Sequence, residues 1–239
     1  MTAALIDSRA GNRINNTLMK NGFTVIELPP ARDLPTPIAA HPDSLMTKIG
    51  ETLILSADYY DDASYVLSDI REYAPHIKIK LASEAYCKEY PYDAVFNALK
   101  IGNRLFCKQD TVSEGIKDEA KERGLEIISV KQGYPHCSVL AIDENTALTA
   151  DEGMAIEMEK HGVKVYRISP GHIALPPYEY GFIGGACGVF GKKIYFFGDY
   201  RSHPSSAVFE KMAEDTGFML VSLDTCELRD LGGIVFLDK

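Results

Sequence analysis

The sequence predicts a single-domain α/β fold, a five-bladed propeller with pseudo-fivefold symmetry in which each unit runs strand, strand, helix, strand. Three observations predict it. Pairs of short apolar runs flank a Gly-X dipeptide, which is typical of a two-residue hairpin turn. A helical segment and a third strand follow each hairpin. The two ends of the chain each supply half of one unit, so the units would close into a ring without exposed strand edges.

The clearest unit is predicted at residues 181–228. Two apolar runs between residues 186 and 197 flank Gly191-Lys192, which predicts two antiparallel strands. A helix is expected from about Pro204, a residue that suits the first helical position, to Gly217, where a glycine commonly follows the last turn. Residues 218–223 then form the third strand of the unit.

The same order recurs in three more units, at about residues 41–89, 90–135 and 136–180. Their predicted hairpin turns are Gly50-Glu51, Gly102-Asn103 and Glu144-Asn145, and their helices end at Pro75, Gly124 and Gly162. Thr111-x-x-Glu114 and Thr149-x-x-Glu152 match the capping box, which predicts that two of these helices begin at the threonines. The repetition favours one architecture for the whole chain.

The fifth unit combines residues 229–239 with residues 1–40. The run from Leu231 to Asp238 copies the Gly-Gly and apolar residues that begin at Ile183, but the chain ends where the hairpin turn should follow. Residues 3–6, 11–21 and 23–28 supply a strand, a helix and a last strand. We therefore expect residues 3–6 to pair with residues 234–237. A doubly wound parallel sheet is the alternative, but it needs one strand per helix where this chain offers three.

Composition limits the possible functions. The 239 residues contain 25 Lys and Arg against 34 Asp and Glu, a net charge of −9, which argues against binding to nucleic-acid phosphates. No apolar run approaches the roughly 20 residues of a membrane helix, and the first residues lack a basic leader, so no membrane association and a cytoplasmic location are predicted. The five cysteines are widely spaced without a C-x-x-C pair, so neither a disulfide framework, a metal site nor a cofactor is predicted.

The order of the repeats, the segment His136-Cys-Ser-Val-Leu-Ala-Ile-Asp143 and the Gly232-Gly233 run resemble the pentein superfamily. Its members include arginine deiminase, dimethylarginine dimethylaminohydrolase and the amidinotransferases. The resemblance covers the whole chain as architecture but few specific motifs. It implies an active site at one mouth of a central channel, where a cysteine thiolate attacks a guanidinium carbon, a histidine protonates the leaving amine and carboxylates hold the cation.

Carried over by position, the resemblance implies His136 as the acid/base, because it opens an inner strand as the family's His-Leu-x-Ser/Thr does. Asp43 and Asp93 are the expected cation holders, with His41 and Asn97 on the same rim; Asn97 stands where the family has an acid. Each of these residues could instead have a turn or structural role. Because the repeats place them at equivalent strand starts, His41, Asp43, Asp93 and His136 are expected to converge.

The nucleophile is where the chain departs from the family. The family's cysteine, about three residues after the Gly-Gly pair, corresponds to Phe236, so Cys187 and Cys226 are the remaining candidates, unless both are ordinary thiols. The predicted function is a divergent hydrolase or transferase acting on a small cationic guanidino or amidino compound. The alternatives are a non-catalytic protein that binds a protein or ribosome surface, or one that senses a metabolite. The oligomeric state is left open.

Overall fold

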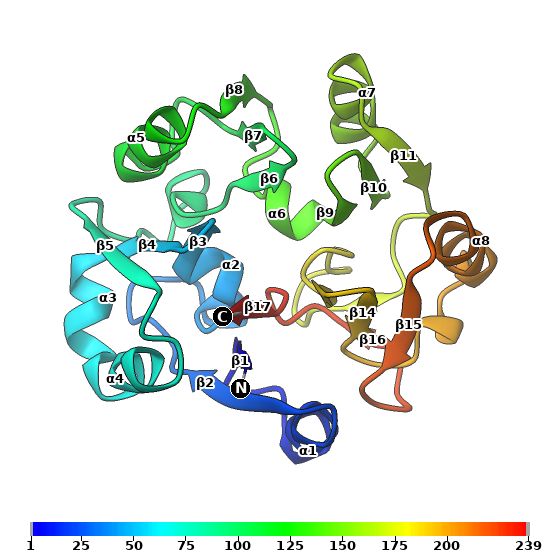
Figure 1. The fold of residues 1–239 in the computed structure, drawn as a ribbon, viewed down its shortest axis with the longest axis horizontal. Helices are drawn as coiled ribbons and strands as arrows, with labels where there is room; N and C mark the ends of the chain where they lie inside the picture. The colour runs from blue at the N-terminus through cyan, green and yellow to red at the C-terminus, as the bar shows by residue number, and fades with distance from the viewer. Residues whose placement is uncertain (1, 238–239) are drawn as a thin grey trace.

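The computed structural model describes residues 2–237 as a mixed α/β fold. Figure 1 shows small sheets arranged around a common centre, with the longer helices on the outside. The last two residues of the predicted terminal unit, 238–239, lie outside the described range. In the part of the chain that is described, no helix has the length and apolar character needed to cross a membrane.

Five three-stranded sheets share one topology: the first strand is antiparallel to the middle strand, which is parallel to the last. Four of them are β3 (Met46–Ile49), β4 (Thr52–Ser56) and β5 (Lys78–Ala82); β6 (Leu99–Ile101), β7 (Arg104–Cys107) and β8 (Glu126–Ser129); β9 (Val139–Asp143), β10 (Thr146–Thr149) and β11 (Lys164–Arg167); and β13 (Cys187–Phe190), β14 (Lys193–Phe196) and β15 (Met219–Ser222). This arrangement excludes a doubly wound parallel sheet.

The fifth sheet joins the two ends of the chain, as predicted. Strand β1 (Thr2–Asp7) pairs antiparallel with β17 (Val235–Leu237), with Ala3 opposite Leu237 and Leu5 opposite Val235. It also pairs parallel with β2 (Phe23–Leu28). Figure 1 shows both termini at this sheet. The pairing of β1 with β17 therefore brings residues from the two ends of the chain into one sheet.

Helices make the crossover that each parallel strand pair requires. They are α1 (Asn12–Lys20), α3 (Ala57–Asp62) with α4 (Ser64–Tyr73), α5 (Glu114–Glu122), α7 (Glu152–Lys160) and α8 (Ser206–Thr216). The remaining elements are the short helices α2 (Pro42–Leu45) and α6 (Pro135–Ser138), the 3₁₀ turns η1 (Thr36–Ile38), η2 (Tyr92–Ala94) and η3 (Tyr200–Ser202), and the parallel pair β12 (Ile173–Ala174) and β16 (Leu228–Arg229).

Both predicted capping boxes are wrong. The Ser113 hydroxyl caps α5 by accepting from the Gly115 amide, and the Asp151 carboxylate caps α7 by accepting from the Met154 amide. Thr149 is already engaged, because its hydroxyl donates to the Ser138 carbonyl and accepts from the Asp151 amide. A side chain closer to the first turn therefore takes each capping position.

The hairpin turns follow the prediction. Gly50, Gly102 and Gly191 all have a φ of +58°, the conformation that a primed turn requires at its first position. A side chain at Gly102 would also meet the Glu144 carbonyl oxygen at 2.6 Å. Glycine is therefore needed there for two independent reasons.

Apolar clusters fill the spaces between neighbouring sheets rather than one central core. One cluster packs Phe106 of β7 with Met154 of α7, and the next joins Leu148 of β10 with Phe196 of β14. A third, containing Tyr195, joins the β13–β15 sheet to the terminal sheet, and the largest joins that sheet to the β3–β5 and β6–β8 sheets. The four clusters together join all five sheets.

Candidate functional site

The candidate site is built on short segments that precede the inner strands. Helix α2 runs directly into β3 and α6 directly into β9, and each helix has a proline in its first turn. Proline is tolerated there because the first helical amide has no intrahelical partner. This local pattern places Asp43 of α2 and His136 of α6 just before the first strands of the β3–β5 and β9–β11 sheets.

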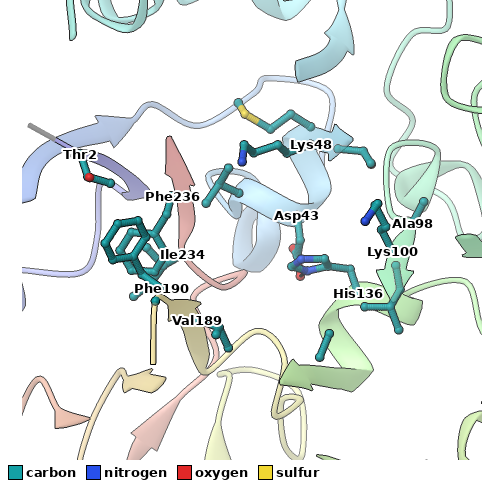
Figure 2. A pocket seen from close by; sticks show the side chains of 16 residues that line it. Thr2, Asp43, Lys48, Ala98, Lys100, His136, Val189, Phe190, Ile234 and Phe236 are labelled. Atoms are coloured by element: carbon teal, nitrogen blue, oxygen red, sulfur yellow. Dashed lines mark ion pairs between the residues drawn. The ribbon is translucent and has the colours of Figure 1, made fainter. Parts of the chain in front are cut away.

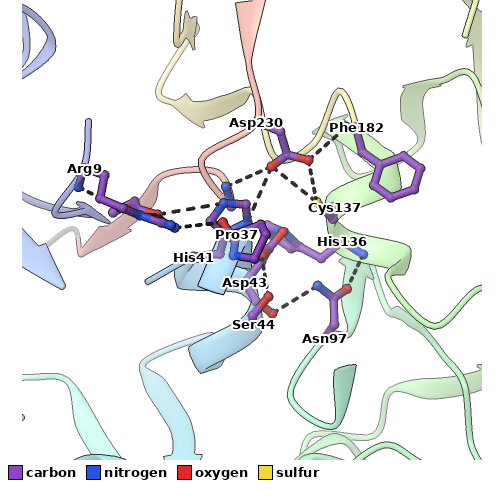
Figure 3. A network of polar contacts seen from close by, with 12 residues as sticks. Arg9, Pro37, His41, Asp43, Ser44, Asn97, His136, Cys137, Phe182 and Asp230 are labelled. Carbon is purple, nitrogen blue, oxygen red and sulfur yellow. Dashed lines mark hydrogen bonds and ion pairs between the residues drawn. The ribbon is translucent and has the colours of Figure 1, made fainter. Parts of the chain in front are cut away.

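Asp43 and His136 meet there, as predicted (Figure 3). The His136 Nδ1 and Asp43 Oδ2 atoms are 3.7 Å apart, with the His136 side chain 37% exposed and Asp43 buried. Asn97 connects the two helices: its amide nitrogen donates to the Asp43 carbonyl at 3.0 Å, and its oxygen accepts from the His136 backbone amide at 2.8 Å. Both polar atoms of the Asn97 side chain are therefore used within the protein.

The Asp43 carboxylate is stabilised by its neighbours. Burial alone would raise the pKa of Asp43, but the imidazoles of His136 and His41 and the Cys137 thiol favour the charged form, so the pKa lies below its ordinary value. Asp43 is thus an ionised carboxylate at neutral pH.

His41 lies deeper, between two other buried carboxylates. Its Nε2 is 3.8 Å from Asp7 Oδ2 and its Nδ1 is 3.6 Å from Asp230 Oδ1, and the side chain is 1% exposed. Arg9 extends this network to the surface, because it pairs with Asp7 at 2.5 Å and donates to the Pro37 carbonyl at 2.9 Å. Figure 3 shows the network running from Arg9 through His41 to Asp230.

Asp230 belongs to the site although the sequence did not single it out. It accepts from the backbone amides of Phe182 at 2.8 Å and Gly232 at 3.1 Å, and the Cys137 thiol donates to it at 3.3 Å. Burial raises the pKa of Asp230 above its ordinary value, and His41 offsets only part of this effect. A side chain at Gly185 would lie 2.0 Å from Asp230 Oδ1, so the backbone closely encloses this carboxyl group.

Asp230 forms part of the wall of a cavity of about 290 Å³, which we call the aromatic cavity. Its lining consists of Ile38, His41, Ser44, Tyr90, Asp93, Tyr134, Cys137, Leu175, Tyr178, Tyr180, Phe182 and Asp230. No Lys or Arg occurs among these described lining residues. Five aromatic rings and two carboxyl groups therefore face one space, and Tyr90 stacks on Tyr134 with ring centroids 6.1 Å apart.

Asp93 is the second carboxyl group of the aromatic cavity. It is 6% exposed, and its Oδ1 is buried without a hydrogen-bond partner among the described residues. Burial raises the pKa of Asp93, and the interaction with the Tyr134 hydroxyl lowers it only in part. An orphaned buried oxygen of this kind is costly unless a ligand or water supplies a donor.

Asp43 and His136 line a different cavity of about 660 Å³ that follows the inner strands, which we call the channel. The predicted site residues are therefore divided: His41 and Asp93 face the aromatic cavity, Asp43 and His136 face the channel, and Asn97 lies between α2 and α6.

The predicted nucleophiles line neither cavity. Cys187 is buried in β13, and its thiol donates to the Ile183 carbonyl at 3.0 Å. Burial raises the pKa of this thiol above its ordinary value. Cys226 is exposed in the loop before β16. Cys137, which the sequence analysis passed over, is the thiol that reaches the aromatic cavity, but burial and the nearby Asp230 and Asp43 raise its pKa. Phe236, which the resemblance to the pentein superfamily places at the position of the catalytic cysteine, packs on Phe23 with ring centroids 4.8 Å apart.

Within residues 2–237, no group of three His, Cys, Asp or Glu side chains could hold a metal ion. The site offers buried carboxylates, imidazoles, a thiol and aromatic rings. Such a set can hold a small cation and exchange protons with it.

Comparison with known families gives one match over most of the chain: residues 5–235 match a family of unknown function, DUF6873. The chain belongs to that family. No match was found among curated proteins. The match therefore shows which family the chain belongs to and carries no information on its activity.

Three solved structures with the same fold are a dimethylarginine dimethylaminohydrolase and two amidinotransferases. A dimethylarginine dimethylaminohydrolase adduct has a TM-score of 0.57 at 14% identity, covering 94% of this chain and 92% of the other. The amidinotransferase SxtG from Microseira wollei has a TM-score of 0.56 at 12% identity, with coverages of 92% and 87%. Inosamine-phosphate amidinotransferase StrB1 from Streptomyces griseus has a TM-score of 0.52 at 15% identity, with coverages of 95% and 78%. The predicted resemblance to the pentein superfamily is confirmed for the fold.

Proposed function

We propose that this DUF6873 protein is a closed five-bladed propeller, with one blade completed by both termini, that binds a small cation carrying a guanidino or amidino group in the aromatic cavity. One observation carries the proposal: two buried carboxyl groups and five aromatic rings line the same small space, and no Lys or Arg is among the described lining residues. The fold shared with guanidino-modifying enzymes supports the choice of ligand class.

The electrostatics of the cavity favour a cation. Burial raises the pKa of both Asp93 and Asp230. The neighbouring protein groups therefore stabilise the charged forms of these two carboxyl groups only in part, and a bound cation would stabilise them further. A guanidinium group has five N–H donors in a plane, which could satisfy the orphaned Asp93 oxygen while its face stacks on a tyrosine ring. A volume of about 290 Å³ is at the small end of ligand pockets, so the ligand should be compact.

The test is calorimetric titration of the whole protein with agmatine, arginine and methylated arginines, with citrulline as a neutral ligand of similar shape. We expect at least one cation to bind at a single site and citrulline not to bind. Asp93→Asn should weaken binding at least tenfold, because a charge-assisted hydrogen bond is replaced by a neutral one. Glu179→Gln, an exposed acid beside Tyr178, is the matched control and should change affinity little. Absence of binding by every cation, or equal binding of citrulline, contradicts the proposal.

A second candidate is catalysis in the same cavity, and the position of Cys137 in its wall favours it. In hydrolysis the thiolate would bond to the guanidino carbon, the C–N bond would break as the amine leaves with a proton, and water would then cleave the C–S bond to give a ureido product and the free thiol. Mass spectrometry after incubation with the same cations tests this reaction. Cys137→Ser should abolish turnover, whereas Cys187→Ala and Cys226→Ala should not. Recovery of unreacted ligand from every incubation with the wild-type protein would exclude catalysis, and cation binding would then be the function of the cavity.

A further inference from the structure

The segment of residues 169–182, which we call the strap, runs between β11 and β13 and forms one side of the aromatic cavity. It supplies four of the residues that line this cavity, Leu175, Tyr178, Tyr180 and Phe182. Figure 2 shows the channel, and no residue of the strap is among the described residues that line it. A movement of the strap would therefore change the wall of the aromatic cavity and leave the channel wall in place.

Few contacts hold the strap. Only Ile173 and Gly181 are buried among residues 169–182. The strand that lies within the strap, β12, is two residues long and pairs with the equally short β16. A segment with so little buried apolar surface opens at a lower cost in free energy than the sheets do. The contacts at its two ends therefore decide whether it stays closed.

The first end of the strap is attached to a buried histidine through Ser205. The Ser169 amide donates to the Ser205 hydroxyl at 2.9 Å, and the Ser205 amide donates to Nδ1 of His203 at 3.0 Å. The His203 side chain is 1% exposed. Because its Nδ1 accepts a hydrogen bond, the imidazole is neutral and carries its proton on Nε2. The neutral form of His203 is therefore part of the attachment.

Protonation of His203 breaks this attachment. A protonated imidazole carries a donor on both nitrogens, so its Nδ1 can no longer accept from the Ser205 amide. Burial lowers the pKa of His203 below its ordinary value, His172 acts in the same direction, and the Gly171 backbone offsets these effects only in part. A histidine whose pKa is lowered on folding contributes stability above its unfolded pKa and loses it as the pH falls. Acid therefore favours a state in which His203 is open to water.

The other groups around the strap act in the same direction or are neutral. The exposed His172 of the strap faces His203 with ring centroids 5.7 Å apart, and the uncharged Phe209 of α8 packs on His203 at 5.4 Å. His172 has a φ of +61°, a conformation that costs a residue other than glycine free energy, so opening relieves it. At the other end of the strap, Asp230 accepts from the Phe182 amide. Burial raises the pKa of Asp230, so its protonation does not favour opening.

We propose that the strap is an acid-sensitive lid of the aromatic cavity, which is released at its Ser169 end when His203 is protonated. Opening takes Tyr178, Tyr180 and Phe182 out of the cavity wall and lets a bound cation leave. The release of a cation rests on the proposed function, whereas the opening itself needs no ligand. A histidine with an ordinary pKa of 6.5 that stays neutral in the closed state shifts the equilibrium toward the open state by up to about tenfold at pH 5.5.

Hydrogen exchange of the ligand-free protein at pH 7.5 and pH 5.5 tests the opening. The rates are corrected for the intrinsic effect of pH on amide exchange. We expect the amides of residues 169–182 to lose up to about tenfold of their protection at pH 5.5, whereas those of the central strand β14 keep theirs. Equal protection of the strap at the two pH values overturns the proposal. An equal loss of protection in the strap and in β14 also overturns it, because the whole molecule would then be opening.

His203→Asn identifies the group that titrates. The Asn side-chain oxygen accepts from the Ser205 amide as Nδ1 does and does not titrate, so protection of the strap should agree within about twofold at the two pH values. His172→Asn suits the positive φ and should keep most of the pH dependence, because burial of His203 is the larger cause. His161→Asn, at the C-terminal end of α7, is the matched control and should behave as wild type. Thermal melting checks folding, and wild-type pH dependence in folded His203→Asn overturns the proposal.

The release of agmatine, followed by NMR exchange measurements, connects the lid to the cavity. Between pH 7.5 and pH 5.5, release from the wild-type protein should accelerate by up to about tenfold more than release from His203→Asn. The comparison of the two proteins cancels the effect of protonating the cavity carboxyl groups. Equal acceleration in both proteins contradicts the lid. Absence of agmatine binding to either protein contradicts the proposed function, and the exchange result for the ligand-free protein then decides on the lid.

Discussion

The aromatic cavity and the channel are built from the same repeated unit but are lined by different parts of it. The aromatic cavity is lined mainly by loops and short turns that precede the inner strands, which carry Asp93, Asp230 and the tyrosines. The channel is lined mainly by the strands themselves. Between the two lies the buried network of His41, Asp43 and Asp230 and their partners. The segments before the strands thus supply the carboxyl groups and aromatic rings of the aromatic cavity, while the strands form most of the channel wall.

The largest expected effect comes from Asp230→Ala. It leaves the Phe182 and Gly232 amides without their acceptor and removes the partner of His41, so we expect a loss of about 2–4 kcal/mol in the free energy of unfolding. Urea denaturation measures this change. Cation binding should also disappear, because one of the two carboxyl groups of the aromatic cavity is gone.

Asn97→Ala should destabilise the protein by about 2 kcal/mol, because it leaves the buried Asp43 carbonyl and His136 amide unpaired. Asn97 also holds together the two helices that carry Asp43 and His136. Chemical denaturation measures the loss of stability. Asn103→Ala, in the exposed hairpin turn after β6, is a control that should cost little. Stability equal to wild type would exclude the bridging role of Asn97.

Folding shifts the pKa values of the buried carboxyl groups in opposite directions, so their contributions to stability depend on pH in opposite ways. The pKa of Asp43 is lowered on folding, so its contribution to stability is present above the unfolded pKa and is lost as the pH falls through the lower folded value. The pKa values of Asp93 and Asp230 are raised, so each contributes stability below its unfolded pKa and loses it as the pH rises through the folded value. Cation affinity should therefore fall on acidification at a pH above the ordinary Asp value of 3.8. Calorimetry across this range checks it, and affinity that is constant down to the ordinary value would contradict the assignment.

The smallest effect is expected at the rim of the aromatic cavity. Tyr178 is 49% exposed, so Tyr178→Leu should weaken cation binding only about twofold to fivefold through loss of a cation–π contact. Tyr65→Leu, on the exposed face of α4, is the control. Titration with agmatine measures both. A larger loss on replacing Tyr178 than on replacing Asp93 would place the ligand at the rim rather than beside the carboxyl groups.

Local signals explain which parts of this structure the sequence predicts. The hairpins depend on glycines with positive φ, and the pairing of residues 3–5 with 235–237 follows from counting repeats, so both are confirmed. The meeting of Asp43 and His136 follows from the same count. The capping residues were missed because the true caps lie closer to the helices than the threonines do.

Asp230 and Cys137 could not be predicted in the same way. Their roles depend on how the Phe182, Gly185 and Gly232 backbones enclose them, and tertiary packing of loops leaves no periodic pattern. The position of Asp230 just before Leu231-Gly-Gly is the one local signal that the sequence offers. Tyr90, Tyr178 and Tyr180 stand in polar and aromatic segments, but nothing in the sequence shows that they line one cavity.

The most direct test of the account is calorimetric titration of the wild-type protein and of Asp93→Asn with agmatine at neutral pH. The account predicts that agmatine binds the wild-type protein at one site and that Asp93→Asn weakens this binding at least tenfold. Failure of agmatine to bind the wild-type protein, or equal affinity for the two proteins, would contradict the central claim.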